Sequence, residues 1–247
     1  MRDASLTLTL VGGPAVLIEF GSIRLLSEPV GACPASPVGM GKRASKASDA
    51  ALDAVLLGDG RCVGRADLAT RVARLGAPPR RICTTRQAAA RLGGNAIGLA
   101  PFETCPLCRG DGSRLLVTAT PVRHEAAGDE VIGFALGAER PGDLLYVAGA
   151  AVWHEGMAEV ADRFAPKAVL LFAAALGAPG ITRAAMSRDD ALRAARAFPG
   201  ATLVAAGDDD GRARPPCREP LALAFARLGL AGRLKFFRKG RPLAIVW

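Results

Sequence analysis

Residues 53–67 read Asp-Ala-Val-Leu-Leu-Gly-Asp-Gly-Arg-Cys-Val-Gly-Arg-Ala-Asp, and this stretch decides the fold. The apolar run at 54–57 predicts a short buried strand, and the three glycines between 58 and 64 predict a loop. Apolar residues with helical spacing follow over 68–75, with arginines between them. A strand, a loop and a helix in this order are typical of open α/β architectures, in which ligands bind at the carboxyl ends of strands.

The rest of the chain predicts two β-rich layers flanked by helices. Alternating or continuous apolar runs predict strands at 5–11, 16–20, 23–26, 81–84, 115–119, 131–136, 144–148, 168–173, 201–205 and 234–237. Helical patterns cover 85–92, 157–164, 188–198 and 221–228. Residues 27–49 are rich in Gly, Pro, Ser and Lys and predict a long loop.

Composition narrows the function classes. The chain has 247 residues, half of them hydrophobic, and no run of eighteen uncharged apolar residues, so no membrane span is expected. The first residues lead directly into a strand pattern without a signal peptide, which predicts a cytoplasmic protein. The net charge of +9 comes from dispersed basic residues, and aromatic residues make up only 5% of the chain, so we expect no nucleic-acid partner.

Six cysteines occur, at 33, 62, 83, 105, 108 and 217, and in a cytoplasmic protein we expect free thiols. Cys105 and Cys108 form a CxxC motif without a second CxxC or a nearby His, so a four-ligand zinc site is not predicted. The motif is either a redox pair or a chance spacing in a hairpin region, and we favour the second interpretation.

One hypothesis for the central loop is a dinucleotide site. Gly58, Gly60 and Gly64 follow a strand and precede a helix, one residue away from the Rossmann spacing. The next strand ends in Cys-Thr-Thr-Arg at 83–86 and supplies no acidic residue for a ribose. We therefore regard dinucleotide binding as the weaker alternative.

Several other segments resemble the metallo-β-lactamase fold family, in the branch of L-ascorbate-6-phosphate lactonase-like and N-acyl-phosphatidylethanolamine phospholipase D-like proteins. The segments that carry this resemblance lie at 10–18, 25–30, 89–104 (including Gly98-Leu99-Ala100-Pro101-Phe102-Glu103-Thr104), 118–124 (Thr-Ala-Thr-Pro-Val-Arg-His), 133–134, 146–153 and 186–202. The resemblance implies an α+β fold, a four-layer αββα sandwich, formed by a single domain over 1–247 with two lobes at roughly 1–115 and 116–247. It also implies an ancestry among metal-dependent hydrolases.

The metal-ligand positions depart from the family. Relatives carry a loop of the type H-D-Q-H-A-D-N after the central strand, and here its ligand positions are Asp59, Cys62 and Gly64. The third family His is kept as His124. The bridging Asp is replaced by Ala150, and the last His falls on Gly207.

These replacements predict a degenerate site. Ala and Gly side chains cannot coordinate a metal, so the second metal should be lost, whereas Asp59, Cys62 and His124 are chemically suitable ligands for one zinc ion. Arg61 and Arg65 would repel a cation but would help to bind a phosphate or a carboxylate. We favour a metal-free pseudoenzyme that binds a small molecule, with a weak one-zinc hydrolase of esters, lactones or phosphoesters as the alternative.

His154, the second histidine of the sequence, comes at the start of a predicted helix. We expect it to be a surface or capping residue without a role in chemistry.

Overall fold

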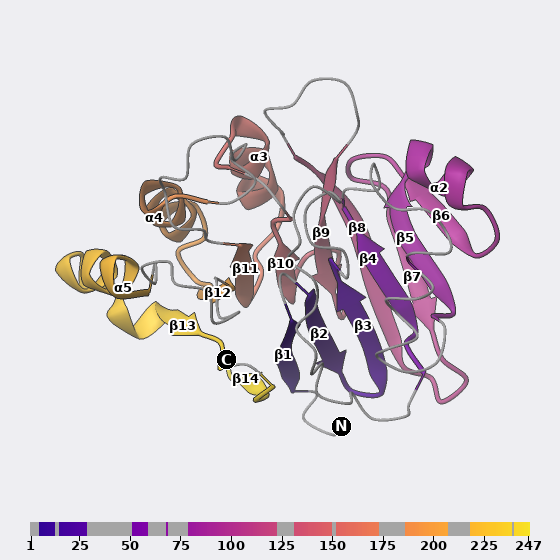
Figure 1. The fold of residues 1–247 in the computed structure, drawn as a ribbon, viewed down its shortest axis with the longest axis horizontal. Helices are drawn as coiled ribbons and strands as arrows, with labels where there is room; N and C mark the ends of the chain where they lie inside the picture. The colour runs from indigo at the N-terminus through magenta and orange to yellow at the C-terminus, as the bar shows by residue number, and fades with distance from the viewer. Residues whose placement is uncertain are drawn as a thin grey trace.

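The computed structural model describes residues 5–12, 15–28, 51–58, 68, 79–122, 131–149, 152–172, 186–206, 218–238 and 240–247. Within these residues the chain forms two seven-stranded sheets, which lie face to face with helices on their outer sides (Figure 1).

Sheet A has the strand order β14-β1-β2-β3-β4-β5-β6. Its strands are β1 (Leu6–Gly12), β2 (Ala15–Phe20), β3 (Ile23–Ser27), β4 (Ala54–Leu57), β5 (Arg81–Thr85), β6 (Ala96–Leu99) and β14 (Leu243–Ile245). The pairs from β14 to β3 are antiparallel, and those from β3 to β6 are parallel.

Sheet B has the order β13-β12-β11-β10-β9-β8-β7 and repeats this pattern. Its strands are β7 (Thr104–Cys108), β8 (Arg114–Pro121), β9 (Ile132–Gly137), β10 (Leu145–Val147), β11 (Ala168–Phe172), β12 (Thr202–Ala206) and β13 (Leu234–Phe236). Pairs from β7 to β10 are antiparallel and those from β10 to β13 are parallel. The chain passes from sheet A to sheet B between β6 and β7, and β14 returns to sheet A. The division of the sequence into two lobes within one domain stays a prediction.

Three apolar clusters separate four layers. The largest lies between the sheets and contains buried side chains of both, such as Leu25, Leu56, Phe134 and Leu170. A second cluster joins the outer face of sheet B to α3 (Glu155–Arg163), α4 (Arg188–Ala197) and α5 (Arg218–Arg227). A third joins the outer face of sheet A to Leu68 and to Leu92 of α2 (Arg86–Leu92).

This arrangement confirms the αββα sandwich expected from the sequence, since each sheet buries one face against the other sheet and its second face under helices. Among the helices of the described residues, none combines the length and the apolar character that crossing a membrane requires.

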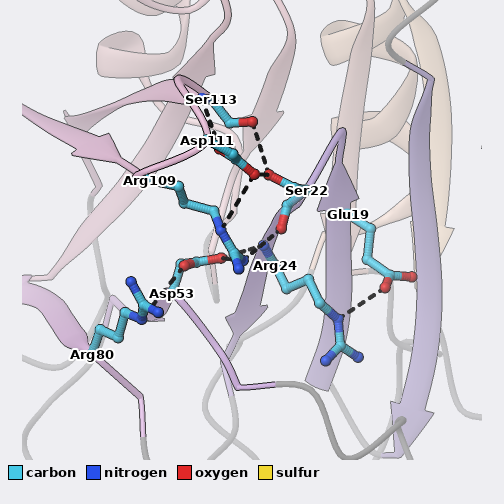
Figure 2. A network of polar contacts seen from close by, with 8 residues as sticks. All are labelled: Glu19, Ser22, Arg24, Asp53, Arg80, Arg109, Asp111 and Ser113. Carbon is cyan, nitrogen blue, oxygen red and sulfur yellow. Dashed lines mark hydrogen bonds and ion pairs between the residues drawn. The ribbon is translucent and has the colours of Figure 1, made fainter. Parts of the chain in front are cut away.

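A polar network joins the two sheets at the end where β4 begins (Figure 2). Asp53, directly before β4, is only 6% exposed at its side chain and accepts hydrogen bonds from the backbone N–H of Arg24 at 2.9 Å and from the Arg109 guanidinium at 3.0 Å. The same guanidinium donates to the carbonyl of Ser22 at 2.8 Å. The Ser22 hydroxyl donates to Asp111 at 2.7 Å. The pKa of the Asp111 carboxyl is lowered to about 2, and this hydrogen bond is the largest cause of the shift.

The strands β6, β7 and β14 were not expected from the sequence, whereas the other strands of the described residues lie within two residues of their predicted bounds. The CxxC motif was expected in a hairpin region, and the structure places it on β7, the edge strand of sheet B. Pro106 lies inside this motif, and a proline is tolerated on an edge strand because its missing N–H removes no interior sheet hydrogen bond.

Candidate functional site

The carboxyl ends of β4, β8 and β10 meet at one point, on Ile132 at the start of β9. Ile132 pairs with Pro121 in the register of β8 and β9, and its backbone N–H donates to the carbonyl of Gly58 at 3.1 Å. A Cβ placed on Gly149 would lie 3.5 Å from the Ile132 carbonyl oxygen and 4.0 Å from Cγ2 of Val122. The hydrogen bond between Gly58 and Ile132 therefore connects sheet A to sheet B beside the ends of three strands.

Gly58 is held there from two sides. Its backbone N–H donates to Oε1 of Glu28 at 3.0 Å, and its carbonyl accepts from Ile132. A Cβ on Gly58 would lie 2.2 Å from the Ile132 carbonyl oxygen and 2.7 Å from Glu28 Oε1. The close approach of the two sheets thus requires glycine at this position.

Glu28 is a residue of this edge that the sequence analysis did not single out. It directly follows β3, its side chain is buried, and its backbone has a φ of 45° although it is not a glycine. Its N–H donates to the carbonyl of Leu56 at 2.9 Å, so that the carboxylate points to the first residue after β4. The signal that could have found it is an acidic residue inside an otherwise apolar segment at a strand end.

The predicted site residues follow, in the sequence, the described residues of this edge and of β12. Asp59, Arg61, Cys62, Gly64, Arg65, His124, Ala150 and Gly207 are all outside the described residues. Their described neighbours in the chain are Gly58, Val122, Gly149 and Ala206. The first three of these neighbours converge on Ile132, and the fourth ends β12 in sheet B, where β10, β11 and β12 run parallel.

The residue types at these positions do not fit a two-metal centre. Such a centre needs a bridging carboxylate and donors on both sides, and positions 64, 150 and 207 carry Gly, Ala and Gly, which have no donor atom in the side chain. Asp59, Cys62 and His124 carry a carboxylate, a thiol and an imidazole, each of which is a known zinc ligand. One metal therefore fits the donor chemistry, and two do not.

His154 is the one histidine among the described residues, and it lies at this edge. It occupies the N-cap position of α3 as expected, but its side chain makes no capping hydrogen bond to the helix. Instead, a Cβ on Gly156 would meet the imidazole Cε1 at 2.8 Å and Cγ of Pro121 at 3.1 Å. Of the expected surface or capping role, the capping part is therefore wrong, and His154 is a partly buried residue whose imidazole lies, with Pro121, beside Gly156.

The dinucleotide alternative finds no support in Gly58. In a dinucleotide site the glycine allows close approach of a pyrophosphate, whereas the space at Gly58 is filled by the Ile132 carbonyl and Glu28. Gly60 and Gly64 lie outside the described residues. The sheets are also mixed and stacked on each other, unlike the single parallel sheet with helices on both faces that this motif requires.

The fold is similar to solved structures of metal-dependent hydrolases. An isothiocyanate hydrolase from Delia radicum gut bacteria shares 18% identity at a TM-score of 0.66, over 98% of this chain and 100% of that chain. A metallo hydrolase from the archaeon Ignicoccus hospitalis shares 18% identity at a TM-score of 0.70, over 98% and 99%. A metallo-β-lactamase fold protein from Bacillus subtilis shares 14% identity at a TM-score of 0.61, over 96% and 99%.

These similarities confirm the metallo-β-lactamase fold. No model of a protein family matches the sequence, and no curated protein matches it. The narrower branch that the sequence resembles stays a prediction.

Proposed function

We propose that this protein is a pseudoenzyme of the metallo-β-lactamase fold that binds a small anionic molecule where its hydrolase neighbours have their active site. The observation that carries the proposal is the residue set at 64, 150 and 207, where the side chains expected to bind the second metal are replaced by Gly, Ala and Gly. Hydrolysis with two metals requires a clamp on both the attacking and the leaving oxygen, and this set supplies no bridging ligand.

Two features support the binding of a ligand, as opposed to a former active site that binds nothing. Arg61 and Arg65 follow Gly58 closely in the sequence, and guanidinium groups bind phosphate and carboxylate groups in a bidentate manner. Gly58, which precedes these residues in the chain, is held by hydrogen bonds to Glu28 and Ile132, so the position at which this segment begins is fixed.

The first test is the metal content of the full chain, purified without chelators and measured by inductively coupled plasma mass spectrometry. We expect substoichiometric zinc, iron and manganese, and only background hydrolysis of an ester, a lactone and a phosphodiester. Two ions per chain, or turnover well above that background, would contradict the proposal.

The second test measures binding of inorganic phosphate by calorimetry. We expect binding to weaken when Arg61 and Arg65 are both changed to Ala. Arg196→Ala, on the exposed face of α4, is the matched control and should leave binding unchanged. Equal binding in all three proteins would refute the role of the two arginines.

A one-zinc hydrolase is the second candidate, favoured by the chemistry of Asp59, Cys62 and His124 and by the convergence of the chain segments that lead to them. A zinc ion bound there would supply a water of lowered pKa and a Lewis acid. Cys62→Ala and His124→Ala should then each abolish both zinc binding and turnover, whereas Cys108→Ala, at an exposed thiol on β7, should change neither. If the wild type and both variants show the same background, the pseudoenzyme proposal stands.

A further inference from the structure

Helix α5 exposes apolar side chains on the face that it turns away from sheet B. The helix contributes two buried residues, Leu221 and Phe225, to the apolar cluster under that sheet. At 3.6 residues per turn Leu223 points in the opposite direction, and it is 52% exposed. Ala222 and Ala226, on either side of it in the chain, are also exposed. A surface helix normally carries polar residues on its outer side, so this face has the composition of a contact surface.

A groove runs along the same face. It has a volume of about 280 Å³ and is bounded on its other side by Arg188, the first residue of α4. The helices α4 and α5 are neighbours at the periphery of the molecule (Figure 1). The α5 residues that line the groove are Glu219, Pro220, Leu223, Ala224 and Arg227. The α5 side of the groove is therefore apolar at its centre and charged at both ends.

The charges at the two ends have no partner among the described residues. No described residue forms an ion pair or a side-chain hydrogen bond with Glu219 or with Arg227. Both side chains are exposed, Glu219 in the first turn of α5 and Arg227 in the last turn. Arg188, by contrast, is paired with Asp189 at 3.2 Å. Two charges of opposite sign are therefore available to a binding partner on this face.

The order of the residues along α5 makes this face complementary to a second copy of itself. Glu219 lies four residues before Leu223, and Arg227 lies four residues after it. When two α5 helices pack antiparallel about a two-fold axis at Leu223, both charges lie about 6 Å along the helix from that axis. Each Glu219 is then opposite Arg227 of the second copy, and the two Leu223 side chains meet at the centre. A parallel pair would instead place like charges opposite each other.

We propose that α5 is the interface of a symmetric homodimer, in which two copies of this chain pack their α5 faces antiparallel, with Glu219 of each copy opposite Arg227 of the other. The small side chains of Ala222 and Ala226 support this packing, because they let helix axes approach to about 8–10 Å. A helix of ten residues is about 15 Å long and buries less than the roughly 800 Å² per partner of a standard interface. The dimer should therefore be weak and dissociate on dilution. This inference does not depend on the function proposed above.

The experiment measures self-association of the full chain by sedimentation velocity. The protein concentration runs from about 1 µM to about 1 mM, the range in which a small interface dissociates. We expect the weight-average sedimentation coefficient to rise from that of a monomer toward that of a dimer. Leu223→Asp should raise the dissociation constant by at least roughly tenfold, because it places two carboxylates opposite each other at the centre of the interface.

Charge reversals test the pairing itself. Glu219→Arg and Arg227→Glu each replace two attractive pairs by two repulsive ones, so each should raise the dissociation constant by roughly tenfold. The variant with both changes restores opposite charges across the interface and should dimerise within about threefold of the wild type. Arg114→Glu is the matched control, since it reverses an exposed charge on β8, away from α5 (Figure 1), and should leave the dissociation constant unchanged.

Three results would each overturn the proposal. The first is a chain that stays monomeric over the whole concentration range, or a dimer that Leu223→Asp leaves intact. The second is a double variant that dimerises as weakly as the single variants while its circular dichroism spectrum equals that of the wild type, because Glu219 and Arg227 then do not pair. The third is binding of the monomer to vesicles of anionic phospholipid that Leu223→Asp abolishes, without self-association, which would assign this face to a membrane surface.

Discussion

Gly58→Ala tests whether the edge that carries the candidate site is built on a close approach of the two sheets. The added Cβ would lie 2.2 Å from the Ile132 carbonyl oxygen and 2.7 Å from Glu28 Oε1. Ordinary van der Waals contact begins near 3.4 Å, so the carbonyl would have to move by about 1.2 Å. This carbonyl belongs to a residue paired with Pro121 in sheet B and cannot move alone.

The expected cost has two parts. Overpacking of a rigid site costs about 1–3 kcal/mol. Displacement of Gly58 also weakens its hydrogen bond to the Glu28 carboxylate, and bonds to charged groups contribute about 1.5–3 kcal/mol. The sum, roughly 3–6 kcal/mol, is a large part of the 5–15 kcal/mol that stabilises a typical domain. For a chain of this length the melting temperature should fall by on the order of 10 °C.

The assay is urea unfolding followed by circular dichroism, supported by a thermal scan. Gly110→Ala is the matched control, because a Cβ there meets no atom within 4 Å and its φ is not positive. It should change stability by less than about 1 kcal/mol. If Gly58→Ala and Gly110→Ala unfold at the same urea concentration, the packing argument is refuted, and the glycine at 58 then needs another explanation, such as the approach of a ligand.

Three further predictions concern other parts of the molecule. Arg109→Ala removes the guanidinium from the buried Asp53 and should lower the free energy of unfolding by about 1–3 kcal/mol in urea titrations; an unchanged midpoint would show that this network does not hold the sheets together. Ser187→Ala removes the capping box of α4 and should cost about 1 kcal/mol, so a melting temperature equal to that of the wild type would contradict it. Alkylation of Cys105 by iodoacetamide should rise with pH through a midpoint near 7, because the thiolate is the reactive form, and Cys83→Ala should move this midpoint upward by removing the hydrogen-bond donor; a wild-type midpoint near 8.5 would refute the assignment.

The sequence predicted the interior strands well because their patterns are local. Continuous apolar runs such as 54–57 and 168–172 are fully buried parallel strands that need no distant information to be recognised. The strands that were missed, β6, β7 and β14, are short edge strands, and β7 contains a proline. They are strands because a neighbour pairs with them; for β14 that neighbour is β1, at the opposite end of the sequence.

The candidate site was predictable only as a set of loops. Strand ends can be read from the sequence, and the family resemblance then named the loop positions that should carry metal ligands. The carboxylate of Glu28 accepts a hydrogen bond from Gly58, and the imidazole of His154 lies with Pro121 beside Gly156, so both positions depend on segments at least 30 residues apart in the sequence. No spacing along the chain specifies such contacts, because they depend on how segments far apart in the sequence pack together.

The two sheets are joined at both ends of the sandwich by contacts between described residues. At one end Asp53 and Arg109 connect sheet A to sheet B, and at the other end the backbone of Gly58 bonds to Ile132. Between them lies a continuous apolar core. Small zinc domains behave differently, since their metal supplies much of the folding free energy. We therefore expect the free energy of unfolding of this protein to depend little on the residues at 64, 150 and 207.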